Sequence, residues 1–130
     1  MSERRIATVA LVVRDYDEAI GWYAEKLGFV LAEDADLGGG KRWVTLDPGN
    51  GGARLLLARA DGERQASRIG DQTGGRVFLF LETDDFARDH AIMLAKGVSF
   101  KEEPRRETYG TVAVFADLYG NLWDLIEPKH

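Results

Sequence analysis

One carboxylate in this sequence has unusual neighbours. Asp124 lies in an otherwise apolar stretch near the end of the chain, which reads Asp117-Leu-Tyr-Gly-Asn-Leu-Trp-Asp-Leu-Ile-Glu127. A carboxylate among apolar side chains prefers to be protonated or to pair with a cation. Asp124 is therefore a candidate for chemistry in two ways, as the polar anchor of a bound molecule or as a general base near neutral pH.

The local pattern around Asp124 decides which side of a sheet it faces. Gly120-Asn121 is a turn signal, so residues 122–127 are predicted to form a strand that follows a turn. Because side chains alternate along a strand, Asp124 faces away from Trp123 and Leu125. If those two apolar side chains pack on a helix, the side that Asp124 faces is either open to water or the wall of a pocket. The sequence leaves both interpretations open.

The other reactive side chains are few. The chain contains no cysteine, which excludes disulfides, thiolate metal sites and cysteine nucleophiles. His90 falls on a predicted helix at the position equivalent to Ile20, where a packed and hydrogen-bonded structural histidine is more common than a metal ligand. His130 is the last residue, and chain ends are commonly frayed.

The length, composition and net charge of the chain narrow the kinds of protein that it can be. The chain has 130 residues, of which 45% are apolar and 30% charged, and its net charge is -5. This length favours one domain with a sizeable core, and the acidic balance disfavours nucleic acid as a partner. No apolar run is long enough for a membrane span or a signal peptide, so we expect no membrane partner and a cytoplasmic location.

The first half of the chain predicts one strand, one helix and three further strands. Residues 6–13 form a β-branched apolar run, which is typical of a strand covered on both faces. Apolar residues recur at helical spacing over 16–27, with Asp15 as a capping residue and Gly28 where a left-handed cap is expected. The three further strands are expected at 29–35, 42–46 and 54–58.

Glycine-rich segments separate these strands at residues 38–40 and 48–52. Phosphate-binding loops lead into the N-terminus of a helix, whereas strands follow both segments here. We therefore expect hairpin turns rather than phosphate-binding loops.

The second half repeats the first. Asp15 and Asp85 are 70 residues apart, and Gly28 and Gly97 are 69 residues apart, which an internal duplication explains. A strand at 77–83, a helix through Phe86, His90, Met93 and Leu94, and strands at 98–101, 111–116 and 122–127 are predicted. We expect one domain made of a first module at 1–59, a linker at 60–74 and a second module at 75–130.

With these elements in place, the chain resembles the vicinal oxygen chelate superfamily, which includes glyoxalase I, bleomycin resistance proteins and extradiol dioxygenases. The resemblance covers nearly the whole chain. It implies an α+β fold in which two paired βαβββ modules form a curled mixed sheet around a cavity, on a scaffold that supports many reactions. It rests on the repeated strand and helix, on the closing stretch that contains Asp124, and on Val12-Val13-Arg14-Asp15-Tyr16-Asp17-Glu18-Ala19 with Tyr23 and Leu27-Gly28-Phe29.

The resemblance also implies positions for metal ligands, one by one. The histidine or glutamine of the first strand falls on Thr8, ahead of Val9-Ala10-Leu11, and the histidine of the second module falls on Phe78. The carboxylate of the first module falls within Leu55-Leu56-Leu57, and only Asp124 remains, in place of the usual glutamate. A divalent metal needs several converging ligands, so we expect neither a metal nor another cofactor.

Alternation along the strands then predicts an apolar ligand pocket with a few carboxylates. Trp43 and Tyr109 are candidate aromatic walls. The predicted lining is Thr8, Ala10, Trp43, Phe78, Phe80, Glu82, Tyr109, Leu122 and Asp124.

Two functions compete for this pocket. In the first, the protein binds a hydrophobic small molecule, including a cationic one, without transforming it, as bleomycin resistance proteins sequester drugs. In the second, it is an enzyme, either a lyase or isomerase like lactoylglutathione lyase or a dioxygenase, which uses Asp124 as a metal ligand or general base. A purely structural role is a third option. The resemblance further implies a homodimer, because neighbouring modules complete the cavities.

Overall fold

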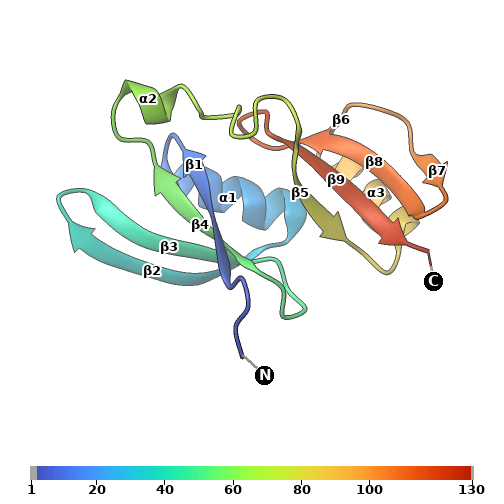
Figure 1. Ribbon diagram of the computed structural model, residues 1–130, viewed down its shortest axis with the longest axis horizontal. Helices are drawn as coiled ribbons and strands as arrows, with labels where there is room; N and C mark the ends of the chain where they lie inside the picture. Colours follow the sequence, from blue (N-terminus) through green and yellow to red (C-terminus); the bar gives the residue numbers. More distant parts are fainter. Residues whose placement is uncertain (1–2, 130) are drawn as a thin grey trace. The chain divides into compact units, whose positions relative to one another are not determined.

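The computed structural model describes residues 3–129 and divides into two compact units, one up to Ile69 and one from Gly70 onward (Figure 1). The division falls within the polar segment predicted as a linker. Each unit contains one mixed sheet and its own helices, so the α+β fold class is confirmed. None of the helices within residues 3–129 is both long and apolar enough to cross a membrane.

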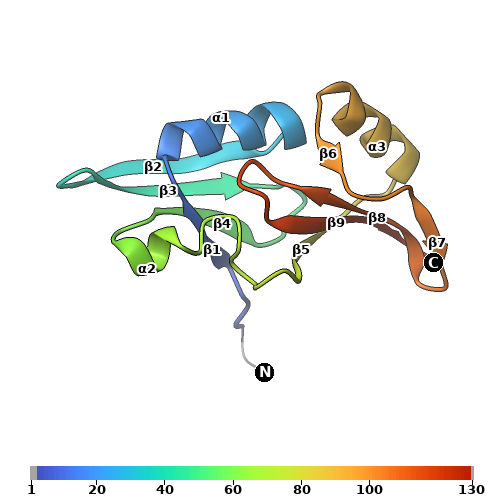
Figure 2. The ribbon, with the colours of Figure 1, turned by 90° about the horizontal axis from the view of Figure 1, so that it is seen from above.

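The first unit is a four-stranded sheet in the order β1-β4-β3-β2, with β1 and β4 parallel and the other pairs antiparallel. Helix α1 lies along one face of this sheet (Figure 2). The opposite face is called the open face below. The elements are β1 (Thr8–Val13), α1 (Tyr16–Leu27), β2 (Val30–Gly38), β3 (Lys41–Asp47), β4 (Arg54–Arg59) and the short helix α2 (Glu63–Ala66).

The second unit repeats this order as β5-β9-β8-β6, again with the first two strands parallel, and β7 pairs with β8 in addition. The same connectivity in both units is what a duplicated module predicts. The elements are β5 (Val77–Glu82), α3 (Phe86–Ala95), β6 (Ser99–Phe100), β7 (Arg105–Glu107), β8 (Gly110–Ala116) and β9 (Leu122–Pro128).

The two long helices begin in the same way. Asp15 accepts a hydrogen bond from the backbone N–H of Glu18 at 2.8 Å, and Asp85 accepts one from that of Arg88 at 3.0 Å. These bonds satisfy backbone donors that the first helical turn leaves free. Gly28 and Gly97, just past the helix ends, both have positive φ, at 72° and 84°, as predicted for left-handed caps.

An aromatic series fills the core between α3 and its sheet. His90 stacks on Phe86 at a centroid distance of 5.2 Å and meets Phe100 at 4.5 Å, and Phe100 in turn contacts Phe115 at 5.6 Å. His90 is thus packed among aromatic rings, as predicted for a structural histidine. His130 lies outside the described residues.

The structure corrects several sequence-based expectations. The first strand is not covered on both faces, because Leu11 and Val13 are buried whereas Thr8 and Ala10 are exposed, and Ile6 lies outside it and is 78% exposed. The segment at 60–74 contains the short helix α2. The second unit has one strand more than βαβββ, since β7, whose three residues are all charged, gives no apolar signal.

Candidate functional site

Asp124 lies in the middle of β9, between two neighbouring strands. It pairs with Phe80 of β5 and with Val114 of β8. Trp123, the next residue on β9, is buried on the other side and stacks on Phe115 at 5.8 Å, within the aromatic core beneath α3. Asp124 therefore faces the side of the sheet opposite to α3, as the alternation predicted.

The carboxylate of Asp124 is buried rather than wet. The residue is 8% exposed, and its Oδ1 atom has no hydrogen-bond partner within residues 3–129. Burial raises the pKa of Asp124, an effect that the Arg105 guanidinium opposes and the Glu102 carboxylate reinforces. A buried carboxylate oxygen without a partner is costly, so Asp124 is a candidate anchor for a bound molecule.

A second buried aspartate on the same segment shows the contrast. Asp117 Oδ1 accepts hydrogen bonds from the backbone N–H groups of Tyr119 at 3.0 Å, Gly120 at 3.1 Å and Asn121 at 2.9 Å. Its Oδ2 accepts from Asn121 Nδ2 and from Trp123 Nε1, each at 3.1 Å. Asp117 is thus saturated by the turn that it organises, and it fixes the indole of Trp123.

The charged side chains described next are Arg105, on the same face of the sheet as Asp124, and the carboxylates that Arg105 binds. Arg105 on β7 pairs with Val112, which pairs with Ile126, so Arg105 is on the same face as Asp124. Its guanidinium donates from Nε to Glu102 at 3.0 Å and from Nη1 to Glu107 at 2.7 Å. One guanidinium therefore serves two carboxylates directly, and none of its hydrogen bonds among residues 3–129 reaches Asp124 Oδ1.

The remaining residues predicted in the second unit are distributed over the same sheet. Phe80 is 63% exposed beside Asp124, and Glu82 pairs with Ile126 and is exposed. Tyr109, also exposed, hydrogen-bonds to Arg105. Phe78 lies at a shift in the β5–β9 register, which interrupts the alternation used to group it with Phe80, and its ring meets that of Trp123 at 6.3 Å. Leu122 is half-buried on β9.

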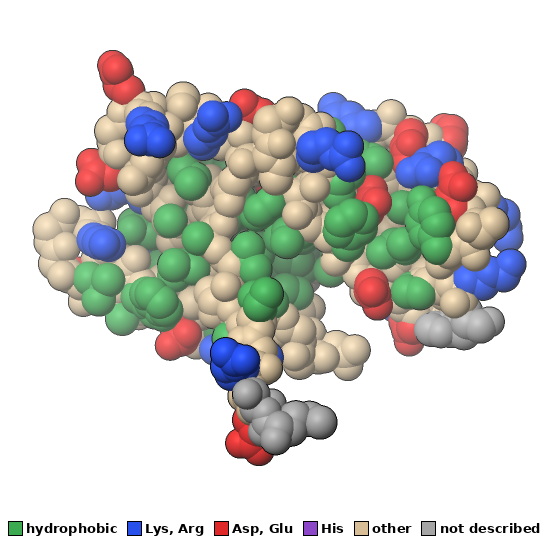
Figure 3. Space-filling model, in the orientation of Figure 1, with side chains coloured by type: hydrophobic (Ala, Val, Ile, Leu, Met, Phe, Trp, Pro, Cys, Tyr) green, Lys and Arg blue, Asp and Glu red, His purple; other side chains and the backbone are tan. Residues whose placement is uncertain are grey.

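The residues predicted in the first unit lie on its open face. Thr8 and Ala10 are exposed on β1 beside their partners Arg54 and Leu56, and Trp43 of β3 is 40% exposed. Figure 3 shows apolar side chains gathered over the strands of each unit.

Neither unit offers the donors of a divalent metal site. The strand partner of Thr8 is the cationic Arg54, and the aliphatic Leu56 follows where a carboxylate is expected. Among residues 3–129 no group of three histidine, cysteine, aspartate or glutamate side chains could hold a metal ion. The residues present do not fit the metal that the superfamily's enzymes use.

Sequence analysis missed polar groups that the fold brings to these faces. Glu102 and Arg105 reach the surroundings of Asp124 only because β7 pairs with β8, which no local signal indicates. On the open face of the first unit, Glu33 accepts a hydrogen bond from the Thr45 hydroxyl at 3.0 Å and forms an ion pair with Arg54 at 3.6 Å.

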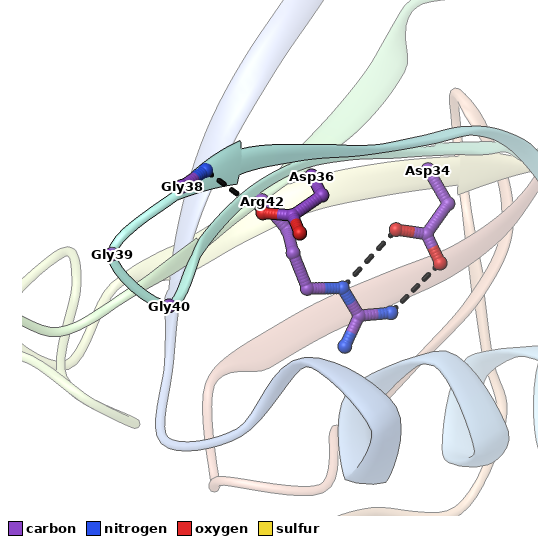
Figure 4. Close-up of a pocket in the computed structure, with 6 residues that line it drawn as sticks. All are labelled: Asp34, Asp36, Gly38, Gly39, Gly40 and Arg42. Atoms are coloured by element: carbon purple, nitrogen blue, oxygen red, sulfur yellow. Dashed lines mark hydrogen bonds and ion pairs between the residues drawn. The ribbon is translucent and has the colours of Figure 1, made fainter.

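A further hollow of about 450 Å³ lies beside the β2–β3 turn, lined by Asp34, Asp36, Gly38, Gly39, Gly40 and Arg42 (Figure 4). The guanidinium of Arg42 donates two hydrogen bonds to the carboxylate of Asp34, at 3.1 and 2.7 Å. It also forms an ion pair with Asp17 of α1 at 3.0 Å. The hydrogen bonds from Arg42 lower the pKa of Asp34. This network ties the hairpin to α1, so its role is structural. The three glycines form a hairpin turn, as predicted.

Comparison with known proteins agrees with this architecture. Residues 5–125 match the model of the Glyoxalase/Bleomycin resistance protein/Dioxygenase superfamily. An uncharacterized protein of Shewanella frigidimarina is 54% identical over 127 residues, which are 96% of this chain and 94% of that protein. The crystal structure of UcmS2 has a TM-score of 0.82 at 29% identity, over 96% of this chain and 98% of that one. TnmS3, an antibiotic binding protein from Streptomyces sp. CB03234, has a TM-score of 0.79 at 27% identity over 99% of both chains.

The burial of Asp124 predicts an unusual dependence of stability on pH. Because its pKa is raised in the folded state, the unfolded state binds fewer protons between the two pKa values, and stability falls as pH rises through that window. Asp124→Asn removes this loss, so its free energy of unfolding should increase relative to that of the native chain on going from acidic to neutral pH. Denaturant unfolding at both pH values measures the difference. A difference that does not change with pH, or that changes equally for Glu103→Gln at an exposed site, would contradict the buried state of Asp124.

Proposed function

We propose that this chain, which belongs to the Glyoxalase/Bleomycin resistance protein/Dioxygenase superfamily, binds a hydrophobic cationic small molecule without the help of a metal ion. The observation that carries the proposal is the buried Oδ1 of Asp124, which has no hydrogen-bond partner within residues 3–129, on a sheet face where the exposed Phe80 lies beside it. A cation placed there gives the carboxylate its missing partner.

The surroundings of Asp124 favour a cation over an anion. The Arg105 guanidinium is already engaged by Glu102 and Glu107, and the Glu102 carboxylate adds negative charge near Asp124. Phe80, which is exposed beside Asp124, offers a ring face to a planar or cationic group. An aromatic ammonium compound satisfies both features.

The relatives support a small molecule as the partner. TnmS3 is an antibiotic binding protein, and its structure covers 99% of this chain. The superfamily scaffold supports several chemistries, so the fold alone does not choose among them. The choice of a binding protein rests on the side chains at the ligand positions of this chain.

An enzyme of the same superfamily is the second candidate, and one observation favours it. The raised pKa of Asp124 suits a general base that works closer to neutral pH than an ordinary aspartate. Its chemistry would be that of a lyase, an isomerase or a dioxygenase.

The chain is predicted to carry no stoichiometric transition metal. Thr8, a leucine within Leu55-Leu56-Leu57 and Phe78 replace the donors expected at the ligand positions, and Asp124 alone cannot hold a divalent ion tightly. Elemental analysis of protein purified without added metal measures the content. The prediction would be contradicted by about one equivalent of zinc, nickel, iron or manganese per chain that is lost in Asp124→Asn. That result would favour the function as an enzyme.

A homodimer is predicted because an exposed sheet face does not enclose a ligand by itself. Small-molecule sites bury most of the ligand surface, so the face that carries Asp124 needs a second wall. We propose that a partner chain supplies this wall. The dimer interface should bury about 1,600 Å² in total. Light scattering that gives a monomer mass at all micromolar concentrations would count against the dimer.

The role of Asp124 is tested with two ligands of the same ring, 2-naphthylmethylammonium and 2-naphthylmethanol. Asp124→Asn keeps the shape of the side chain and removes its charge, so it should weaken the ammonium ion by about 1–3 kcal/mol and leave the alcohol nearly unaffected. Tryptophan fluorescence titration measures both affinities. Glu103→Gln, which removes an exposed charge from the same unit, is the control. Equal losses for both ligands, or no loss for either, would rule out Asp124 as the anchor.

A further inference from the structure

The corresponding strand pairs of the two units differ in length. In the second unit, β8 and β9 pair over seven positions, from Gly110↔Pro128 to Ala116↔Leu122. In the first unit, β3 and β4 pair over only three positions, ending at Val44↔Leu57. Beyond that pair, β3 continues beside β2 and β4 continues beside β1, so the two strands diverge toward the β2–β3 turn (Figure 1).

A hollow of about 790 Å³ occupies the region where the strands diverge, and we name it the splay pocket. This volume lies within the range of small-molecule sites. The exposed Trp43 and Leu37 give it apolar walls. Its lining also includes Lys41, Leu56, Ala58, Arg59, Asp61 and Gln65, all from the first unit.

Two cations of the splay pocket are available to a ligand. Within residues 3–129, the side chains of Lys41 and Arg59 form no ion pair and no hydrogen bond. Arg42, by contrast, is turned toward Asp34 and is saturated by carboxylates (Figure 4). Asp61 is the one carboxylate in the lining, so the pocket is locally positive on a chain whose net charge is -5.

The guanidinium of Arg59 is held in place without a carboxylate. It lies over the ring of Tyr16, 5.5 Å from the ring centroid. On its other side it approaches the hairpin turn, where a Cβ atom at Gly40 would lie 3.1 Å from Nη2. The absence of a side chain at Gly40, whose φ is +83°, therefore leaves room for the Arg59 guanidinium beside the hairpin turn. Its N–H donors stay free for a planar anion.

We propose that the splay pocket binds a planar aromatic carboxylate. The ring packs against Trp43, with Leu37 and Leu56 as further apolar contacts. The carboxylate accepts hydrogen bonds from Arg59 and pairs with Lys41. This inference does not rest on the function proposed for Asp124, since all of the lining belongs to the first unit.

The test follows the indole N–H resonance of Trp43 by NMR while 2-naphthoate is added to the full chain. The resonance is expected to shift and to saturate. Arg59→Gln should weaken binding about tenfold, the effect of losing a hydrogen bond to a charged group. The matched control Arg4→Gln, which removes an exposed cation elsewhere in the unit, should leave the affinity unchanged. Unchanged amide resonances away from residue 59 show that the variant is folded.

Three further binding measurements test whether the splay pocket is a separate site for aromatic carboxylates. Cyclohexanecarboxylate should bind more weakly than 2-naphthoate, because it lacks a planar ring, and inorganic phosphate should not compete. Asp124→Asn should leave the affinity for 2-naphthoate unchanged. Competition by phosphate, equal binding of the two carboxylates, no effect of Arg59→Gln, or a loss in Asp124→Asn would each overturn the splay pocket as a separate aromatic carboxylate site.

Discussion

In the second unit, the strand pairing buries the carboxylate of Asp124, although burial disfavours its charged form. The strand pairs with Phe80 and Val114 and the burial of Trp123 beneath α3 hold this carboxylate on the opposite face of the sheet. There, its Oδ1 has no hydrogen-bond partner in the part of the chain that the structure describes. The neighbouring Asp117 shows that the same segment can satisfy a buried carboxylate fully, with five hydrogen bonds to its two oxygens. The lack of a partner at Asp124 is therefore a local property of this site, and it is the reason for proposing a cationic ligand there.

The two units share one connectivity but have diverged in the chemistry of their surfaces. The second unit keeps β8 and β9 paired throughout and gathers carboxylates around Arg105. In the first unit β3 and β4 separate, and among the described residues Arg59 and Lys41 have no carboxylate partner. A duplicated module allows this, because each copy conserves the strand order through its own core and can vary its exposed face.

Local signals predicted the parts of the fold that depend on neighbouring residues. The helix at 16–27 has the predicted limits because Asp15 and Gly28 act within one turn of its ends. The orientation of Asp124 followed from alternation alone. Pairing between distant segments was not predictable in this way: β7 has no apolar pattern, so the placement of Arg105 near Asp124 was missed. The register shift at Phe78 and the early end of the β3–β4 ladder likewise depend on tertiary contacts that the sequence does not display.

We propose that the buried carboxylate of Asp124 binds a cationic group. The most direct test of this proposal is the ¹³C resonance of the Asp124 carboxyl carbon, assigned by its absence in Asp124→Asn and followed as a function of pH. In the free protein, we expect the pKa of Asp124 to lie above that of an ordinary aspartate. When 2-naphthylmethylammonium is bound, we expect this pKa to be lower. A pKa at or below the ordinary value in the free protein, or one that the ammonium ion leaves unchanged, would contradict the proposal.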